Sequence, residues 1–178
     1  MTGTGNRKHR KQGERMNEDT RSAARAIIDG NMYMVLATVG PDGAPWASPV
    51  FYSTEDGRDL YWVSSPEVTH SRNIAHEPRI GIVLHDSRAP VGTASPFALY
   101  LKATAVELPG EEVLEGLRVI PGPAGRGGRS LAPEEVRPPA PWRVYRARIS
   151  EYSMICPRGE GRCAEHGLDY EHRATVRL

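Results

Sequence analysis

The stretch MYMVLATVGPDGAPWASPVFYS, residues 32–53, decides the fold of this chain. It contains two apolar runs, 32–39 and 46–53, separated at residues 40–45 by the segment GPDGAP, which is dense in turn-forming residues. The first run is apolar on both faces, which predicts a strand that is buried on both sides. Because the turn is too short for a crossover connection, we expect the two runs to pair as antiparallel strands.

The alternation of apolar runs and turns continues along the chain. A turn at residues 55–58 precedes a third expected strand at 60–64, so the first three strands are expected to form an antiparallel meander. Later runs predict strands at 79–84, 97–107 and 142–155. Alternate residues are apolar throughout 97–107, the period of two that a half-buried strand shows. Strands that follow one another through short turns are expected to curl into a small barrel, since closure removes exposed edges. The predicted fold class is therefore mainly β and antiparallel.

A few helices are predicted to flank this sheet. The first spans residues 17 or 20 to 29, where apolar residues recur at three- and four-residue spacing, and it stops at Gly30. The second begins with Ser65 as its N-cap and a proline at the first helical position. The third is a small amphipathic helix at 111–120.

The chain length and composition predict one globular domain with additions. With 178 residues, 39% hydrophobic and 25% charged, residues 18–178 are expected to form one domain whose core is 32–107. Residues 1–17 are polar and basic, so we expect a disordered tail. The Pro- and Gly-rich segment 121–141 is expected to be a mobile loop that serves as a linker or as a lid.

Charge and targeting signals limit the classes of partner. The formal net charge is +1, which argues against binding nucleic acid or a membrane through the field of the whole protein. The cluster RKHRK at residues 7–11 is short enough that a solvated tail is favoured over a nucleic-acid contact. No run is long enough to span a membrane, the N-terminus lacks the apolar region of a secretory signal, and two cysteines make no disulfide framework. We therefore expect a cytoplasmic protein.

No motif for nucleophilic, metal or nucleotide chemistry stands out in the sequence. Cys156, Cys163 and His166 raise the question of zinc, but the gap between the cysteines is wider than in the usual zinc knuckle and a fourth ligand is not evident. We therefore predict no metal site and interpret His166 and His172 as ordinary surface residues.

A more informative group of residues surrounds the start of the second predicted helix. Ser64 and Ser65 end a strand, and the helix that follows carries His70 and Arg72. Free backbone N–H groups at a helix start, together with hydroxyls and basic side chains, can hold a phosphate where no P-loop exists. The alternative is that Ser65 merely caps the helix while His70 and Arg72 are solvated. The spacing alone leaves both interpretations open.

Three segments, taken together, resemble a known family. They are VLATVGPDGAP at residues 35–45, SPVFY at 48–52 and HSRNIAHEPR at 70–79. Their order resembles that of the pyridoxamine 5'-phosphate oxidase-like proteins, which are FMN-binding split β-barrels. The resemblance covers about residues 27–108, and it implies a homodimer that holds a flavin in a cleft between the two subunits.

The resemblance also implies roles for particular residues. Residues of the second and third strands would hold the flavin ring and ribityl chain, and the following helix would bind the phosphate. The implied ring contacts are Ser48, Pro49, Val50, Phe51 and Trp62; the implied ribityl and phosphate contacts are Val63, Ser64, Ser65, His70 and Arg72. Asn73 would fix the helix to the next strand.

The sequence departs from the oxidases themselves at several positions. Basic residues of their second strand are replaced here by Ala47 and Tyr52, and Trp142-Arg143 matches their C-terminal arginine motif only faintly. Vitamin B6 oxidation is therefore not expected. The implied function is an oxidoreductase that transfers hydride or electrons between FMN and a small molecule. The alternatives are a reductase that uses the deazaflavin F420, and a flavin- or haem-binding module without turnover.

Overall fold

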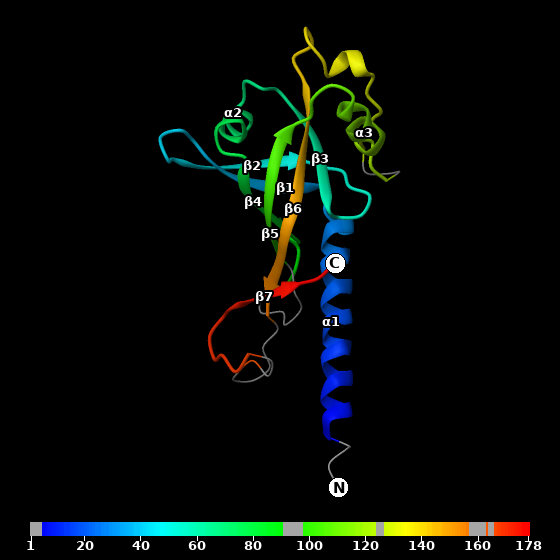
Figure 1. Ribbon diagram of the computed structural model, residues 1–178, viewed down its shortest axis with the longest axis vertical. Coiled ribbons are helices and arrows are strands. Elements are labelled where there is room, and N and C mark those ends of the chain that lie inside the picture. The colour runs from blue at the N-terminus through cyan, green and yellow to red at the C-terminus, as the bar shows by residue number, and fades with distance from the viewer. Residues whose placement is uncertain (1–4, 91–97, 124–126, 157–162, 164–165) are drawn as a thin grey trace.

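The computed structural model describes residues 5–90, 98–123, 127–156, 163 and 166–178 (Figure 1). Its elements, in chain order, are α1 (Gly5–Gly30), β1 (Tyr33–Val39), β2 (Pro45–Phe51), β3 (Asp59–Ser64), α2 (Thr69–His76), β4 (Arg79–His85), β5 (Ala98–Glu107), α3 (Glu112–Val119), the short 3-10 helix η1 (Pro133–Glu135), β6 (Arg143–Ile155) and β7 (Arg173–Val176). The described strands form one antiparallel sheet, which confirms the predicted fold class. None of the described helices has both the length and the apolar character that a membrane span requires.

The sheet closes on itself as a split barrel. Its strand order is β2-β1-β4-β5-β6-β3, with β7 added along β6. The two end strands meet at one bridge, where the Ser53 N–H donates to the Tyr61 carbonyl over 2.9 Å and the Tyr61 N–H donates back over 2.8 Å. Closure through a single bridge leaves the rest of the seam between β2 and β3 open.

The third strand does not simply extend the first hairpin. We expected a meander of three antiparallel strands, but β3 pairs along its length with β6, and it meets the second strand only at Ser53. β2 ends at Phe51, and the next residue, Tyr52, is fully buried, with its hydroxyl donating to the Ile28 carbonyl of α1 over 2.6 Å. The chain is thus fixed to α1 at the point where the Ser53 bridge joins the two ends of the sheet.

The first strand is buried on one face only, so the prediction of two buried faces is wrong. Met34, Leu36 and Thr38 point into the core, whereas Tyr33 and Val39 on the other face are exposed. The core-facing residues follow the period of two, and no described layer covers the opposite face. An apolar outer face remains available for a partner.

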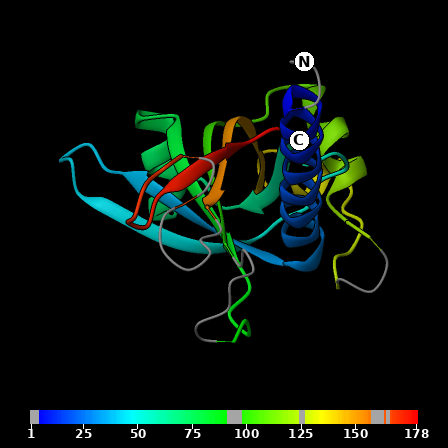
Figure 2. The same cartoon turned by 90° about the horizontal axis from the view of Figure 1, so that it is seen from below.

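Helix α1 runs beside the sheet and contacts β7 near the C-terminus (Figure 2). Ala24, Ile27 and Ile28 pack into the barrel core, as their spacing predicted. The helix begins at Gly5, whereas the sequence predicted a disordered tail up to residue 17. Lysine, arginine, glutamine and glutamate have good helix propensity, which favours a helix through this polar segment.

A second, smaller core lies on the outside of β3 and β6. Helix α3 packs there, and the segment after it contributes Val136, which is almost completely buried. The expectation that residues 121–141 lack structure of their own is wrong at Pro133–Glu135, where η1 forms. Leu131 also packs against this cluster, so an apolar contact fixes part of a segment that its Pro and Gly content marked as a loop.

Gly116 lets α3 approach the sheet closely. A Cβ atom at this position would lie 2.6 Å from Val144 Cγ1 and 3.2 Å from Leu108 Cδ1. We therefore expect Gly116→Ala to lower the free energy of unfolding by about 1–3 kcal/mol, measured by urea denaturation, because the added methyl overpacks the contact. Gly30→Ala is the matched control, because no atom lies within 4 Å of its added Cβ. Equal stability of the two variants would contradict this account of the packing.

Candidate functional site

A pocket of about 420 Å³ lies where β2, β3, the start of α2 and the segment after α3 meet. Most of the residues that the sequence predicted for cofactor binding line it: Pro49, Val50, Phe51, Trp62, Val63, Ser64 and His70. Ser53, Tyr61, Ile120, Gly128, Arg129 and Leu131 complete the lining. The open seam between β2 and β3 thus forms a cavity within the usual size range of small-ligand sites, about 300–1,000 Å³.

His70 and Ser64 form the polar end of the pocket. A hydrogen bond of 2.8 Å joins the Ser64 Oγ and the His70 Nε2, and both residues are buried. Burial lowers the pKa of His70 below its ordinary value, so the ring is neutral at pH 7. The interpretation of His70 as a solvated residue is therefore wrong. A neutral ring paired with a hydroxyl can contact a phosphate oxygen through hydrogen bonding, and an arriving anion would favour its protonation.

The buried state of His70 predicts a pH dependence of stability. The folded chain binds a proton at His70 less readily than the unfolded chain, whose histidine pKa is about 6.5. The contribution of His70 to the free energy of unfolding is therefore fully present above pH 6.5. It is lost as the pH falls towards the folded-state pKa, and the free energy of unfolding then changes by at most about 1.4 kcal/mol per pH unit.

We expect His70→Gln to reduce this acid-induced loss, measured as urea unfolding at pH 7.5, 6.5 and 5.5. The matched control is His85→Gln at an exposed histidine, which should keep the wild-type pH dependence. Wild type and His70→Gln losing the same stability between pH 6.5 and 5.5 would refute the role assigned to His70.

Trp62 provides an apolar wall of the pocket. Its ring stacks on Tyr145, with 5.5 Å between ring centroids and an interplanar angle of 17°. Its indole N–H is buried and has no hydrogen-bond partner among the described residues. A buried donor without a partner costs about 1–3 kcal/mol, so a ligand acceptor in the adjoining pocket would be a favourable partner.

Ser48 and Ser65, two of the predicted contacts, do not line the pocket. The Ser48 Oγ accepts a hydrogen bond from the Trp46 indole over 2.8 Å. We predicted Ser65 as the N-cap of α2, and this prediction is wrong. The Ser65 Oγ instead accepts a hydrogen bond from the Glu67 N–H over 3.2 Å. Residues 65–68 form a turn, which delays the start of the helix to Thr69 with Val68 at the N-cap position.

Arg72 and Asn73 also lie outside the pocket lining. Arg72 is exposed on α2. Asn73 is buried, and its Nδ2 donates to the Thr38 Oγ1 over 3.0 Å. Asn73 therefore fixes α2 to β1 by this bond, rather than to the next strand in the sequence as the resemblance implied.

The segment after α3 adds a cation that the sequence did not single out. Arg129 lines the pocket and forms an ion pair with Glu135, with 2.6 Å between Nη2 and Oε1. This pairing raises the pKa of Arg129 and lowers that of Glu135, so both groups are charged at pH 7. Sequence signals placed this arginine only in a Gly-rich loop, and its place in the pocket lining depends on tertiary packing.

Apart from His70, which is neutral at pH 7 and paired with Ser64, the described pocket lining contains no side chain suited to act as a general base. Burial, reinforced by a hydrogen bond from the Tyr61 hydroxyl to Glu115, raises the pKa of Tyr61 to about 12, so the phenol stays protonated. Three further residues whose side chains can act as acids or bases, Tyr33, Tyr52 and His85, are absent from the pocket lining. Redox chemistry at this site would be supplied by a bound cofactor.

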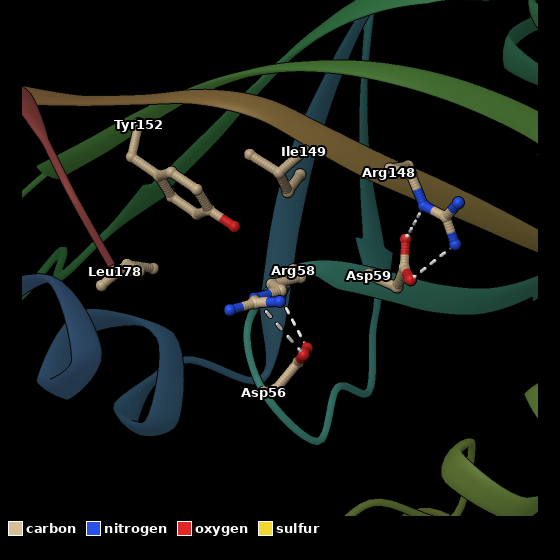
Figure 3. Close-up of a pocket in the computed structure, with 7 residues that line it drawn as sticks. All are labelled: Asp56, Arg58, Asp59, Arg148, Ile149, Tyr152 and Leu178. Carbon is tan, nitrogen blue, oxygen red and sulfur yellow. Dashed lines mark hydrogen bonds and ion pairs between the residues drawn. The ribbon is translucent and has the colours of Figure 1, made fainter.

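A second pocket, of about 560 Å³, is larger, but the charged side chains that line it form ion pairs with one another (Figure 3). It lies against β6 and the C-terminal Leu178. Arg148 pairs with Asp59 at 3.0 Å, and Arg58 pairs with Asp56 at 3.8 Å. Because its charged groups neutralise one another, it offers less for a phosphorylated ligand than the pocket at the β2–β3 seam.

The closed sheet, its open seam and the pocket lining define a split β-barrel with a small-ligand site. Residues 20–156 match the family model described as pyridoxamine 5'-phosphate oxidase. The chain therefore belongs to the pyridoxamine 5'-phosphate oxidase-like family. Among curated proteins, no sequence matches this chain.

Solved structures share the fold at low sequence identity. A haem-binding protein from Mycobacterium smegmatis is 22% identical with a TM-score of 0.60; the match covers 86% of this chain and 56% of that protein, so this chain spans little more than half its length. A putative pyridoxamine 5'-phosphate oxidase from Listeria innocua is 18% identical with a TM-score of 0.55, covering 76% and 97%. A haem storage protein from Vibrio cholerae is 17% identical with a TM-score of 0.54, covering 71% and 87%. At these identities the likeness concerns the fold alone.

Proposed function

We propose that this protein is an oxidoreductase that binds FMN in the pocket at the β2–β3 seam and exchanges hydride or electrons with a small molecule. The observation that carries the proposal is the convergence of Val50, Phe51 and Trp62 with Ser64 and His70 on one pocket. Apolar walls with a few polar groups at one end suit a flavin ring that carries a phosphorylated chain. FMN, when bound, supplies the redox chemistry.

The residues of the pocket divide into two groups by chemistry. Val50, Phe51 and Trp62 would exclude water from the ring, and the Trp62 N–H would find an acceptor on the ligand. Ser64, His70 and Arg129 would hold the phosphate, with Arg129 exchanging part of its pairing to Glu135 for the new anion. This assignment replaces Arg72 with Arg129 as the arginine of the site.

The apolar outer face of the first hairpin supports a homodimer. β2 lies at one end of the strand order, and Pro45, Ala47 and Pro49, which share a face with Tyr33 and Val39, are exposed on it. Tyr33 and Val39 extend the exposed apolar surface onto β1. Exposed apolar patches of this kind are typical of protein–protein interfaces, and a second copy here would lie beside the β2 wall of the pocket.

Haem is less well suited to this pocket than a flavin. Haem iron takes an axial histidine, cysteine, methionine or tyrosine. Within the lining, His70 Nε2 is paired with Ser64, and the Tyr61 hydroxyl is paired with Glu115. F420 carries a phosphorylated chain like that of FMN, so the phosphate contacts would suit both cofactors. The titration described next distinguishes them.

The test is a titration of the ligand-free full-length chain with FMN, riboflavin, F420 and haemin, followed by fluorescence or absorbance. We expect FMN to bind more tightly than riboflavin, because only FMN uses the phosphate contacts. If the chain binds F420 but not FMN, F420 rather than FMN is the cofactor. If it binds only haemin, the proposal is refuted. Reduction of the bound flavin by a reduced nicotinamide would support turnover, whereas a flavin that no nicotinamide reduces would favour the binding-module alternative.

A further inference from the structure

Four potential metal ligands meet at the connection between β6 and β7. Cys156 follows the last residue of β6 and His172 precedes the first residue of β7, while Cys163 and His166 lie between them in the chain. One ligand atom from each residue lies within 4.8 Å of the others. Both cysteines are buried, and the two histidines lie towards the surface.

Three separations between the ligand atoms match the edges of a zinc-centred tetrahedron, and a fourth is shorter. Zn–S bonds of about 2.3 Å and Zn–N bonds of about 2.05 Å place ligand atoms about 3.8 Å (S–S), about 3.5 Å (S–N) and about 3.4 Å (N–N) apart. The His166 Nδ1 lies 3.5 Å from the Cys163 Sγ and 3.7 Å from the Cys156 Sγ. The His172 Nε2 lies 3.3 Å from the His166 Nδ1, and the two sulfur atoms are 3.3 Å apart, somewhat closer than the ideal edge.

The surrounding hydrogen bonds orient the ligands towards one point. The His172 Nδ1 lies 3.0 Å from the Tyr170 carbonyl, which can only accept, so Nδ1 carries the proton and the Nε2 lone pair faces the cluster. The Cys156 N–H donates to the His172 carbonyl over 2.9 Å, and this bond joins the two ends of the connection. The Gly167 N–H donates to the Cys163 carbonyl over 2.8 Å, which holds the middle ligands together.

We propose that Cys156, Cys163, His166 and His172 bind one Zn²⁺ ion as a closed Cys2His2 site. Four protein ligands leave no open position, so the ion is structural rather than catalytic. The site lies at the end of β6 opposite to Arg143, which pairs with Ser64, and is therefore remote from the β2–β3 pocket. The ion fixes β7 on β6 and with it Val176, which belongs to the barrel core.

This arrangement corrects the interpretation of His166 and His172 as ordinary surface residues. The spacing C-x6-C-x2-H-x5-H did not reveal the fourth ligand, because His172 reaches the cluster only once β7 pairs with β6. A disulfide between the cysteines is the competing chemistry. It would need the sulfur atoms to close from 3.3 Å to about 2.05 Å and would leave both histidines without a function.

The experiment measures zinc in the untagged full-length chain, purified under reducing conditions and incubated with ZnCl2. We expect about one zinc per chain by elemental analysis, near zero in Cys156→Ser and His172→Asn, and an unchanged ratio in the control His85→Asn. Co²⁺ in place of Zn²⁺ should give the thiolate-to-cobalt charge-transfer band of a tetrahedral site, and Cys156→Ser should lose it.

A second measurement is independent of whether the variants fold. Removing the metal from the wild-type chain with a chelator should accelerate amide hydrogen exchange in β7 and leave exchange in β1 unchanged. A wild-type chain that binds neither Zn²⁺ nor Co²⁺ after reduction would overturn the proposal. So would zinc retained in full by both ligand variants, or an intramolecular disulfide, found by mass, that re-forms in preference to metal binding.

Discussion

Trp62→Ala is expected to lower the free energy of unfolding by about 3–5 kcal/mol, the range for a buried tryptophan reduced to alanine. The side chain is 1% exposed, belongs to the barrel core and stacks on Tyr145. Because it also forms a wall of the pocket, the same change should abolish flavin binding. Urea denaturation and FMN titration measure the two effects on one preparation.

Trp142→Ala is the matched control for this prediction. Trp142 is 49% exposed and lies just before β6, so its loss should change stability by no more than about 0.5 kcal/mol. Trp62→Phe separates folding from binding, because it keeps an aromatic ring against Tyr145 while removing the indole N–H. Equal destabilisation by Trp62→Ala and Trp142→Ala would contradict the placement of the core.

Arg129→Ala should raise the dissociation constant for FMN about 10- to 150-fold. A hydrogen bond to a charged partner contributes about 1.5–3 kcal/mol, and every 1.4 kcal/mol corresponds to a factor of ten. Riboflavin lacks the phosphate, so its affinity should stay the same. Calorimetric or fluorescence titration of wild type and variant with both ligands measures the difference.

Two further variants identify the source of the Arg129 effect. Arg118→Ala removes another exposed arginine, one that is paired with Glu55 outside the pocket, and should leave FMN affinity unchanged. Glu135→Gln weakens the competing ion pair and should keep or strengthen FMN binding. An Arg129→Ala chain that binds FMN as tightly as the wild type would remove this residue from the site.

The strands were predictable because their signal is local. Alternation at 97–107 and the turn residues at 40–45 are read directly from neighbouring residues, and β5 and the first hairpin lie within one or two residues of their predicted positions. The predicted start of β5 at Phe97 lies outside the described residues. The pairing of β3 with β6 was not predictable, because it joins two segments far apart in the sequence that no local signal links.

The site was predictable on β2, β3 and at His70, but not in the segment after α3. Residues of β2 and β3 were assigned through the family resemblance, and most of them line the pocket. Arg129 was missed because its position depends on the packing of Leu131 and Val136 against α3 and the sheet. The hydrogen bond between Ser64 and His70 could not be inferred either, because a turn rather than an N-cap joins β3 to α2.

The most direct test of the central claim is the absorbance spectrum of the full-length protein as purified, with mass spectrometry of the small molecule released on denaturation. The account predicts a yellow protein with the absorption of an oxidised flavin, and release of a molecule with the mass of FMN. A protein that carries no flavin and gains none when mixed with excess FMN would contradict it.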